Sequence, residues 1–337
     1  AGIIGQERAV AALQAGLDIH DNGYNIYVSG PPGIGKMAAV QRFLEERAGA
    51  QPVPPDWCYV HGFEDPYKPT VFRLPAGRGR RFQQDMQAVI AQVRSEIPRA
   101  FEGEPYATQR DEITRSIDQQ REQLIGQLNE RALHEGFAIK ITPTGIIVLP
   151  LANGHPMRDD EFEALSEEQR AALLQRRDAV QAELQVVMKQ GHALERAAQE
   201  QLRTLDQQIV LSIVGGLFDE IIERYRDLPE IAAYLQGIQH DILEHSELFR
   251  SPGAAGGMPE SLAAASPWMQ EIPFRKYQVN VLVDNSRQSG APVVVELNAS
   301  YINLFGRIEK ESLFGSLTTD FTQIKPGSIH QANSGYL

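Results

Sequence analysis

The sequence feature that most restricts the possible folds of this chain is a glycine-rich loop. It lies between an apolar run and a helix-forming stretch. The loop is Gly30-Pro31-Pro32-Gly33-Ile34-Gly35-Lys36-Met37, which has the spacing G-x-x-x-x-G-K. It follows residues 25–29, a predicted strand, and precedes residues 37–48, a predicted helix. Glycines let successive backbone N–H groups curve around a phosphate, and a helix N-terminus adds partial positive charge. The pattern predicts a phosphate-binding loop in which Lys36 contacts the β- and γ-phosphates.

The residue after the lysine departs from the usual pattern. A Ser or Thr hydroxyl normally stands there and ligates Mg²⁺, whereas this chain has Met37. A thioether does not suit a hard cation that prefers oxygen, so Mg²⁺ binding is expected to be weakened unless water and a downstream acid hold the ion. The alternative is that the loop is a Gly/Pro-rich turn that only starts a helix.

Composition restricts the partners and the compartment. The chain has 32 Lys and Arg against 44 Asp and Glu, a net charge of -12, which disfavours nucleic-acid binding. The densest basic run, 77–81, is interpreted as a solvated helix start. The single cysteine, Cys58, cannot form an internal disulfide, so a reducing cytoplasm is expected. No run of 18 apolar residues occurs, so no membrane span is predicted.

Residue composition and predicted secondary structure divide the chain into four zones. Residues 1–78 and 273–337 read as α/β segments, with further strands predicted at 57–60, 279–284 and 292–297. Residues 79–250 are rich in Gln, Glu, Arg, Ala and Leu and are predicted to be mainly helical. Residues 251–272 are rich in Gly, Pro, Ala and Ser and are predicted to form a flexible linker or loop.

Two stretches of the helical zone have apolar residues at coiled-coil spacing. Leu173, Val180, Val187 and Leu194 recur every seven residues, and upstream Ile117 and Leu124 also lie seven apart, followed by Leu128 and Leu133. We expect the stretches to pack as a long antiparallel helical hairpin. Residues 137–151 have β-branched arms around Pro143-Thr144-Gly145, which predicts a small β-hairpin at its tip.

No catalytic or metal-binding constellation is predicted within the chain. His240 and His245 lie five apart on a predicted helix, so their rings diverge and do not form a zinc pair. No serine has a nucleophile motif around it. Glu64 and Asp65, just after a strand, are interpreted as turn residues.

Longer segments resemble a known family. The segments IIGQERAVAALQAGL, YNIYVSGPPGIGK and NLFGRIE…GSIHQANSGYL resemble the AAA+ module of bacterial Lon-like ATP-dependent serine proteases. The resemblance is greatest to the group in which a long helical domain interrupts the module. It implies an α/β P-loop NTPase (AAA+) core, 1–78 and 273–337, interrupted by the mainly helical insertion 79–250 with its helical and β-hairpins.

The resemblance also assigns residues to a nucleotide site. It implies ATP or ADP at Gly30, Pro31, Pro32, Gly33, Ile34, Gly35, Lys36 and Met37, with Ile3, Ile4, Gly5 and Gln6 beside the adenine. The final GSIHQANSGYL matches the approach to the Walker B strand. The Walker B acids and a Ser-Lys peptidase domain are therefore expected outside this chain.

The same resemblance implies the partners. They are unfolded or damaged proteins as substrates, and a homo-oligomeric ring, a hexamer, in the full-length protein. An aromatic side chain before the Walker B strand would grip polypeptide in the pore, and Phe314 and Phe321 are the candidates. Core packing is the alternative for both. Tyr301, Leu304 and Phe305 are predicted to be core residues.

Three functions stay open from the sequence. The first is the nucleotide-binding and substrate-handling part of a Lon-like ATP-dependent protease. The second is a degenerate, non-hydrolysing AAA+ scaffold or gate for an ATP-independent peptidase, because of Met37. The third is a coiled-coil P-loop ATPase of DNA maintenance, which the acidic composition and the absence of a Leu-Ser-Gly-Gly element disfavour.

Overall fold

A computed structural model describes residues 6–19, 23–65, 67–142, 145–152, 154–250, 271–313 and 316–337. The chain divides into two compact units. Unit 1 comprises Ala1–Gln92, Phe218–Ile238 and Gly253–Leu337, and unit 2 comprises Val93–Leu217 and Gln239–Pro252. The predicted domain boundaries at 78, 250 and 272 stay a prediction.

Unit 1 is built on a three-stranded sheet. Its order is β2 (Thr70–Leu74), β1 (Asp56–Val60) and β6 (Val279–Val283), with both neighbouring pairs antiparallel. Alternate residues of β1, namely Asp56, Cys58 and Val60, are buried, as expected for a strand with one covered face. The strands predicted at 57–60 and 279–284 are confirmed within one residue.

Helical residues of unit 1 cover one face of this sheet. They are the parts of three helices that lie in unit 1: the start of α3 (Arg78–Glu102), the end of α6 (Glu167–Arg224) and most of α7 (Pro229–Glu244). The ring of Phe72 in β2 lies 6.4 Å from that of Phe82 in α3, which in turn lies 5.4 Å from Tyr225 after α6. This aromatic contact forms the centre of the unit 1 core.

Two predicted strands are absent. Residues 25–29 have no strand structure, and Tyr27 is 90% exposed. Residues 292–297 contribute only one parallel bridge, between Val293 and Tyr336. Both predictions were wrong for the same reason: a strand needs a partner, and no described strand pairs along either segment.

Short elements complete unit 1. Helices α1 (Glu7–Leu17) and α2 (Lys36–Ala48) flank the glycine-rich loop. After β6 come α11 (Tyr301–Phe305) and α12 (Ser328–Gln331), with the antiparallel pairs β8 (Glu311–Leu313) with β9 (Ser316–Thr318) and β7 (Arg307–Ile308) with β10 (Ile324–Lys325). Of two 3-10 turns, Ile272–Tyr277 comes directly before β6 and Phe321–Gln323 lies between β9 and β10.

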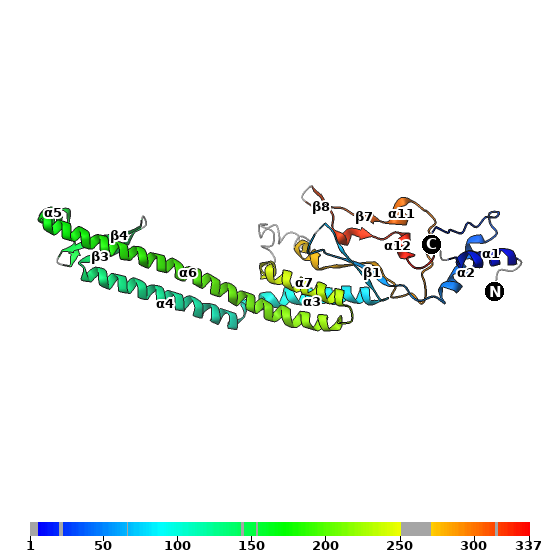
Figure 1. Cartoon of the computed structure of the whole chain (residues 1–337), viewed down its shortest axis with the longest axis horizontal. Helices are drawn as coiled ribbons and strands as arrows, with labels where there is room; N and C mark the ends of the chain where they lie inside the picture. The colour runs from blue at the N-terminus through cyan, green and yellow to red at the C-terminus, as the bar shows by residue number, and fades with distance from the viewer. Residues whose placement is uncertain are drawn as a thin grey trace. The chain divides into compact units, whose positions relative to one another are not determined.

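Unit 2 contains a long pair of helices. Figure 1 shows α4 (Glu104–His134) alongside α6. Near one end Tyr106 donates a hydrogen bond to Asp206 over 2.9 Å, and near the other Arg131 pairs with Glu183. The two helices therefore run antiparallel, as the sequence predicts, while their status as an insertion in a P-loop core stays a prediction.

A small sheet lies at the Arg131–Glu183 end of this pair. Strands β3 (Phe137–Thr142) and β4 (Gly145–Ala152) form an antiparallel hairpin, which β5 (His155–Pro156) extends. The predicted β-hairpin is confirmed, although Pro143 and Thr144 lie outside the described residues. The short helices α5 (Asp159–Glu163) and α8 (Glu247–Arg250) also belong to unit 2.

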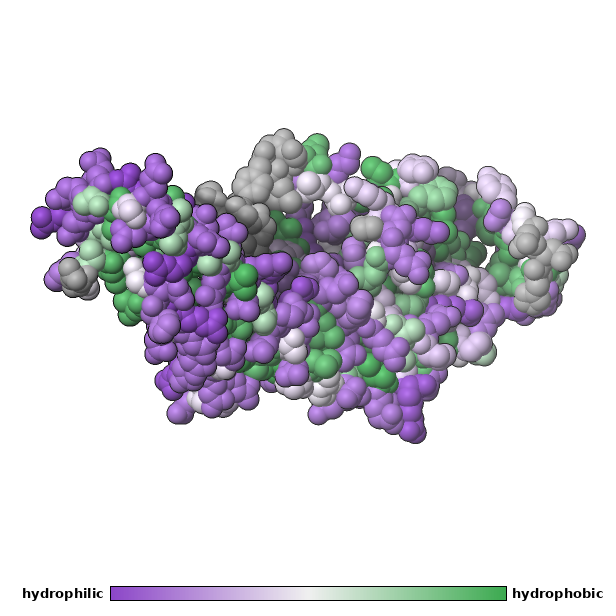
Figure 2. Space-filling model, turned by 60° about the vertical axis from the view of Figure 1, so that its left-hand side comes forward, coloured by the Kyte–Doolittle hydropathy of each residue, from purple (hydrophilic) through white to green (hydrophobic). Residues whose placement is uncertain are grey.

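The apolar seam between α4 and α6 follows the predicted spacing. Ala132, Phe137 and Val180 form a buried cluster, with Ile139, Val148 and Leu173 packed against it. Leu133 was predicted in the seam but is 59% exposed, because Ala132, one residue earlier, faces α6 instead. In Figure 2 hydrophilic residues, in purple, cover much of the visible surface of these helices, as expected outside the seam.

The predicted linker mostly lies outside the described residues, which resume at Glu271. Ile272, predicted in the linker, instead opens a 3-10 turn. Across the described parts of the chain, no helix has the length and apolar character needed to span a membrane.

Candidate functional site

The glycine-rich loop has the backbone conformation that its sequence predicts. Gly33 and Gly35 have φ values of +80° and +77°, in the left-handed region that favours glycine. Gly35 is also the N-cap of α2, which begins at Lys36 and has no side-chain cap. The first N–H groups of α2 are therefore available to an anion, and the helix dipole favours negative charge there.

The side chain of Lys36 folds back onto the loop and contacts its backbone. The Lys36 ammonium donates to the carbonyl oxygens of Gly30 over 2.5 Å and of Pro31 over 2.8 Å. A Cβ at Gly30 would lie 3.2 Å from Lys36 Cδ and 3.1 Å from Ile34 Cδ1, so glycine leaves room for this arrangement. Lys36 is thus held at the loop, where its charge is available to a phosphate that displaces the carbonyls.

The residues of the loop fit a phosphate better than a metal ion. All of residues 30–35 are exposed, and Met37 is 58% exposed at the position where a magnesium-binding hydroxyl is expected. Its thioether supplies no oxygen. Among the described residues, no group of three or more His, Cys, Asp or Glu side chains could hold a metal ion.

The helix that follows the loop is anchored at its far end. The Ala48 carbonyl accepts a hydrogen bond from the Ala291 N–H over 3.0 Å. Arg47 pairs with Asp18, just after α1, over 2.5 Å. Gln51 donates to the Tyr336 hydroxyl over 2.9 Å. Segments far apart in sequence therefore fix the C-terminal end of α2.

The predicted adenine residues are only partly visible. Ile3, Ile4 and Gly5 lie outside the described residues. Gln6 is the N-cap of α1, where its carbonyl accepts the Val10 N–H over 3.0 Å. Within the described chain, Gln6 makes no hydrogen bond to the loop. The adenine site stays a prediction.

The aromatic residues singled out in the sequence differ in burial. Phe321 is only 8% exposed, and its ring lies 6.2 Å from that of His61, which is the core packing considered as the alternative. Phe314 lies outside the described residues, between β8 and β9. Tyr301 and Phe305 were predicted to be core residues, but they are 76% and 51% exposed. Residue type alone does not indicate this exposure, because apolar residues in a short helix are usually buried.

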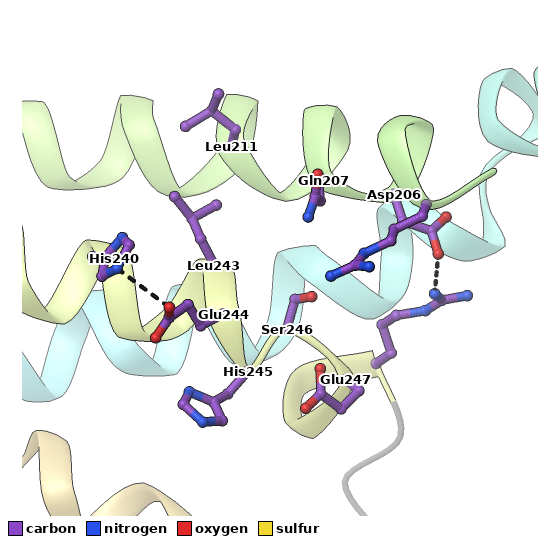
Figure 3. A pocket seen from close by; sticks show the side chains of 11 residues that line it. Asp206, Gln207, Leu211, His240, Leu243, Glu244, His245, Ser246 and Glu247 are labelled. Carbon is purple, nitrogen blue, oxygen red and sulfur yellow. Dashed lines mark hydrogen bonds and ion pairs between the residues drawn. The ribbon is translucent and has the colours of Figure 1, made fainter. Parts of the chain in front are cut away.

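Unit 2 has a separate cavity of about 830 Å³ between α6, the end of α7 and α8, shown in Figure 3. His240 lies 3.4 Å from Glu244, and Arg250 pairs with Asp206. The rings of His240 and His245 lie apart in Figure 3, as their five-residue spacing predicts. The cavity rim is charged, and the Arg250–Asp206 ion pair neutralises two of its charges.

Two families match parts of the chain. Residues 56–89 match the Lon-like LonC helical domain, and residues 289–337 match the LonB-like AAA domain. The first match covers β1, β2 and the start of α3. The second match begins just before Ala291, which donates a hydrogen bond to the C-terminal end of α2, and it ends at the last residue. These two matches support a Lon-like protease AAA+ module in this chain.

The AAA match implies a P-loop NTPase fold and nucleotide binding for this Lon-like module. Neither match includes residues 30–37, so the loop geometry and the family matches are independent observations. No curated protein matches the chain.

Proposed function

We propose that the Lon-like module binds ATP or ADP at residues 30–37 and handles polypeptide for an ATP-dependent protease. One observation carries the proposal: an uncapped helix N-terminus follows two positive-φ glycines, with the Lys36 ammonium beside it. In a chain that carries an AAA match, this arrangement is the expected cradle for a terminal phosphate.

Lys36 and the N-terminus of α2 would each donate hydrogen bonds to the phosphate. Phosphate oxygens would replace the Gly30 and Pro31 carbonyls as acceptors for Lys36, which exchanges neutral acceptors for charged ones. The first N–H groups of α2 would add donors without any side chain. When bound, the nucleotide supplies a phosphoanhydride whose hydrolysis can drive work.

Finer parts of the proposal rest on the sequence resemblance. They are adenine contacts at Ile3, Ile4, Gly5 and Gln6, a pore aromatic at Phe314, a hexameric ring, and a downstream Ser-Lys peptidase that receives unfolded or damaged proteins. The buried ring of Phe321 cannot grip a polypeptide without first leaving its contact with His61.

Met37 favours a second candidate. A module that binds nucleotide without Mg²⁺ would serve as a non-hydrolysing scaffold or gate for a peptidase. The exposed thioether, at the position of the usual hydroxyl, is the observation behind it. Mg²⁺ dependence of binding separates the two candidates.

Calorimetric titration of the chain with ATP and ADP, with and without Mg²⁺, tests the proposal. We expect Lys36→Ala to weaken ATP binding at least about tenfold, because a phosphate loses its charged donor. Lys189→Ala is the matched control, since Lys189 is an exposed lysine on α6 in unit 2.

The outcomes are distinct. Binding that is unchanged in Lys36→Ala contradicts a site at residues 30–37. Binding that depends on Lys36 but not on Mg²⁺ supports the scaffold, whereas dependence on both supports the ATP-driven module.

A further inference from the structure

The stretch from Leu297 to Ile308 exposes large apolar side chains without an evident structural reason. Leu297 is 84% exposed, Tyr301 76%, Ile302 53%, Phe305 51% and Ile308 58%. These five residues are called the α11 surface. Exposed aromatic residues close together are unusual on a folded chain and commonly mark a contact surface.

The aromatic rings of this surface form a pair. Tyr301 and Phe305 lie four residues apart in α11, and their ring centroids are 4.9 Å apart with an interplanar angle of 31°. Stacking fixes each ring against the other while both remain accessible. A preformed pair of aromatic rings loses little conformational entropy on binding, which is typical of binding hot spots.

Polar contacts hold α11 in place beneath the rings. The Ser300 hydroxyl accepts the Asn303 N–H over 3.2 Å, and the Asn303 side chain donates to the Asn298 carbonyl over 2.8 Å. The Ser328 hydroxyl contacts Glu296 over 2.7 Å and the Asn303 carbonyl over 3.1 Å. The rings are thus carried by an anchored element, and their exposure is not the result of a frayed end.

The chain turns sharply after the rings. Gly306 has φ +81°, and a Cβ there would lie 2.2 Å from the Lys325 carbonyl oxygen. Residues 325–327 therefore pack directly against the backbone at the end of α11. This close approach fixes the end of the helix while Tyr301 and Phe305 stay exposed.

The chemistry of the surface favours an uncharged apolar partner. From Leu297 to Gly306 the chain has no charged residue, although its net charge is -12. The charges that border this run are Glu296, which accepts hydrogen bonds from the Ser328 hydroxyl and the Asn298 N–H, and Arg307, which pairs with Glu309 over 2.7 Å. Because these charges already have partners, the surface suits an uncharged apolar partner better than a strongly charged one or a nucleic acid.

A small-molecule ligand is also disfavoured. Four cavities of 330, 460, 600 and 830 Å³ occur among the described residues, and none of the five residues of the α11 surface lines them. The α11 surface offers exposed side-chain contact area. Such a surface suits a segment of polypeptide that presents its own apolar side chains.

We infer that the α11 surface binds apolar side chains of unfolded polypeptide, the substrate class of the proposed function. The inference rests on that function and assigns the contact to Tyr301 and Phe305. It is separate from the prediction of a pore aromatic at Phe314. A contact made only through apolar side chains does not require a particular sequence in the bound polypeptide. A protein that binds many different unfolded chains needs this tolerance.

Fluorescence anisotropy of fluorescein-labelled casein, an unfolded polypeptide, tests the inference on the 337-residue chain. We expect the double variant Tyr301→Ala/Phe305→Ala to bind casein at least about fivefold more weakly than the parent chain. Tyr301→Phe should retain binding, because it keeps the ring. Tyr67→Ala is the control, since Tyr67 is 97% exposed elsewhere in unit 1.

Circular dichroism of each variant, together with ATP calorimetry, separates loss of folding and loss of the nucleotide site from loss of this contact. Equal casein binding by the double variant and the parent overturns the inference and leaves the proposed function intact. A parent chain that does not bind casein overturns both the inference and the polypeptide-handling part of the proposed function. A dimer that dissociates in the double variant, with casein binding unchanged, overturns it in favour of a second copy as the partner.

Discussion

At the scale of the residue, chemistry at single positions of the loop decides what the site can bind. Gly33 and Gly35 adopt positive φ, and Lys36 donates to two loop carbonyls. Met37 is the one departure from the usual pattern, and its exposed side chain can be replaced without disturbing the core. Substitution of Met37 therefore tests directly whether nucleotide binding needs a residue that ligates Mg²⁺ at this position.

Met37→Thr should make ATP binding depend more strongly on Mg²⁺, by about tenfold or more, because threonine supplies the missing hydroxyl ligand. Titration calorimetry with and without Mg²⁺ measures the change. Met37→Val is the control, since valine has nearly the shape of threonine but no hydroxyl. An equal gain in both variants would show that side-chain shape is responsible and would refute a metal-ligand role.

At the scale of the element, one apolar seam joins α4 to α6. Val180 is 3% exposed and contacts the cluster of Ala132 and Phe137. Val186, less than two turns further along the same helix, is 54% exposed. The spacing of apolar residues thus separates the buried and exposed faces of α6 as the sequence predicts.

Val180→Ala should lower the free energy of unfolding by about 2 kcal/mol, because it removes buried methyl groups and leaves a cavity. Val186→Ala should change it by less than about 0.5 kcal/mol. Urea denaturation followed by circular dichroism measures both. Similar losses for the two variants would mean that the seam does not bury Val180.

At the scale of the whole molecule, unit 1 is closed by backbone contacts between distant segments. A Cβ at Gly290 would lie 2.2 Å from the Ala48 carbonyl oxygen, and one at Gly335 would lie 2.2 Å from that of Pro292. The Ala291 N–H donates to the same Ala48 carbonyl. The end of the loop helix is therefore packed against residues more than two hundred positions later in the chain.

Gly290→Ala should destabilise unit 1 by about 2 kcal/mol or more, because the added methyl group forces two backbone segments apart. Gly237→Ala is the control in the same unit. Its nearest neighbour outside α7 is Phe63 at 3.9 Å, so it should raise stability by about 0.5 kcal/mol through helix propensity. Thermal unfolding compares the pair, and a neutral Gly290→Ala would contradict the close packing.

Much of the local structure could be predicted because it depends on neighbouring residues. The glycine conformations of the loop, the helix that begins at Lys36, the seam of Val180 and the hairpin at 137–151 all follow from short-range spacing. The family matches, at residues 56–89 and 289–337, agree with the resemblance stated from the sequence.

Tertiary structure decided the remainder. Whether an apolar segment becomes a strand depends on a partner, and residues 25–29 and 292–297 lack one along their length. Whether an aromatic ring is buried depends on what folds over it. Phe321 is covered beside His61, whereas Tyr301 and Phe305 are held outward on an anchored helix. Local spacing carries no information about these distant neighbours, so the sequence determined the loop and the helices, and the packed chain determined which apolar surfaces stay open.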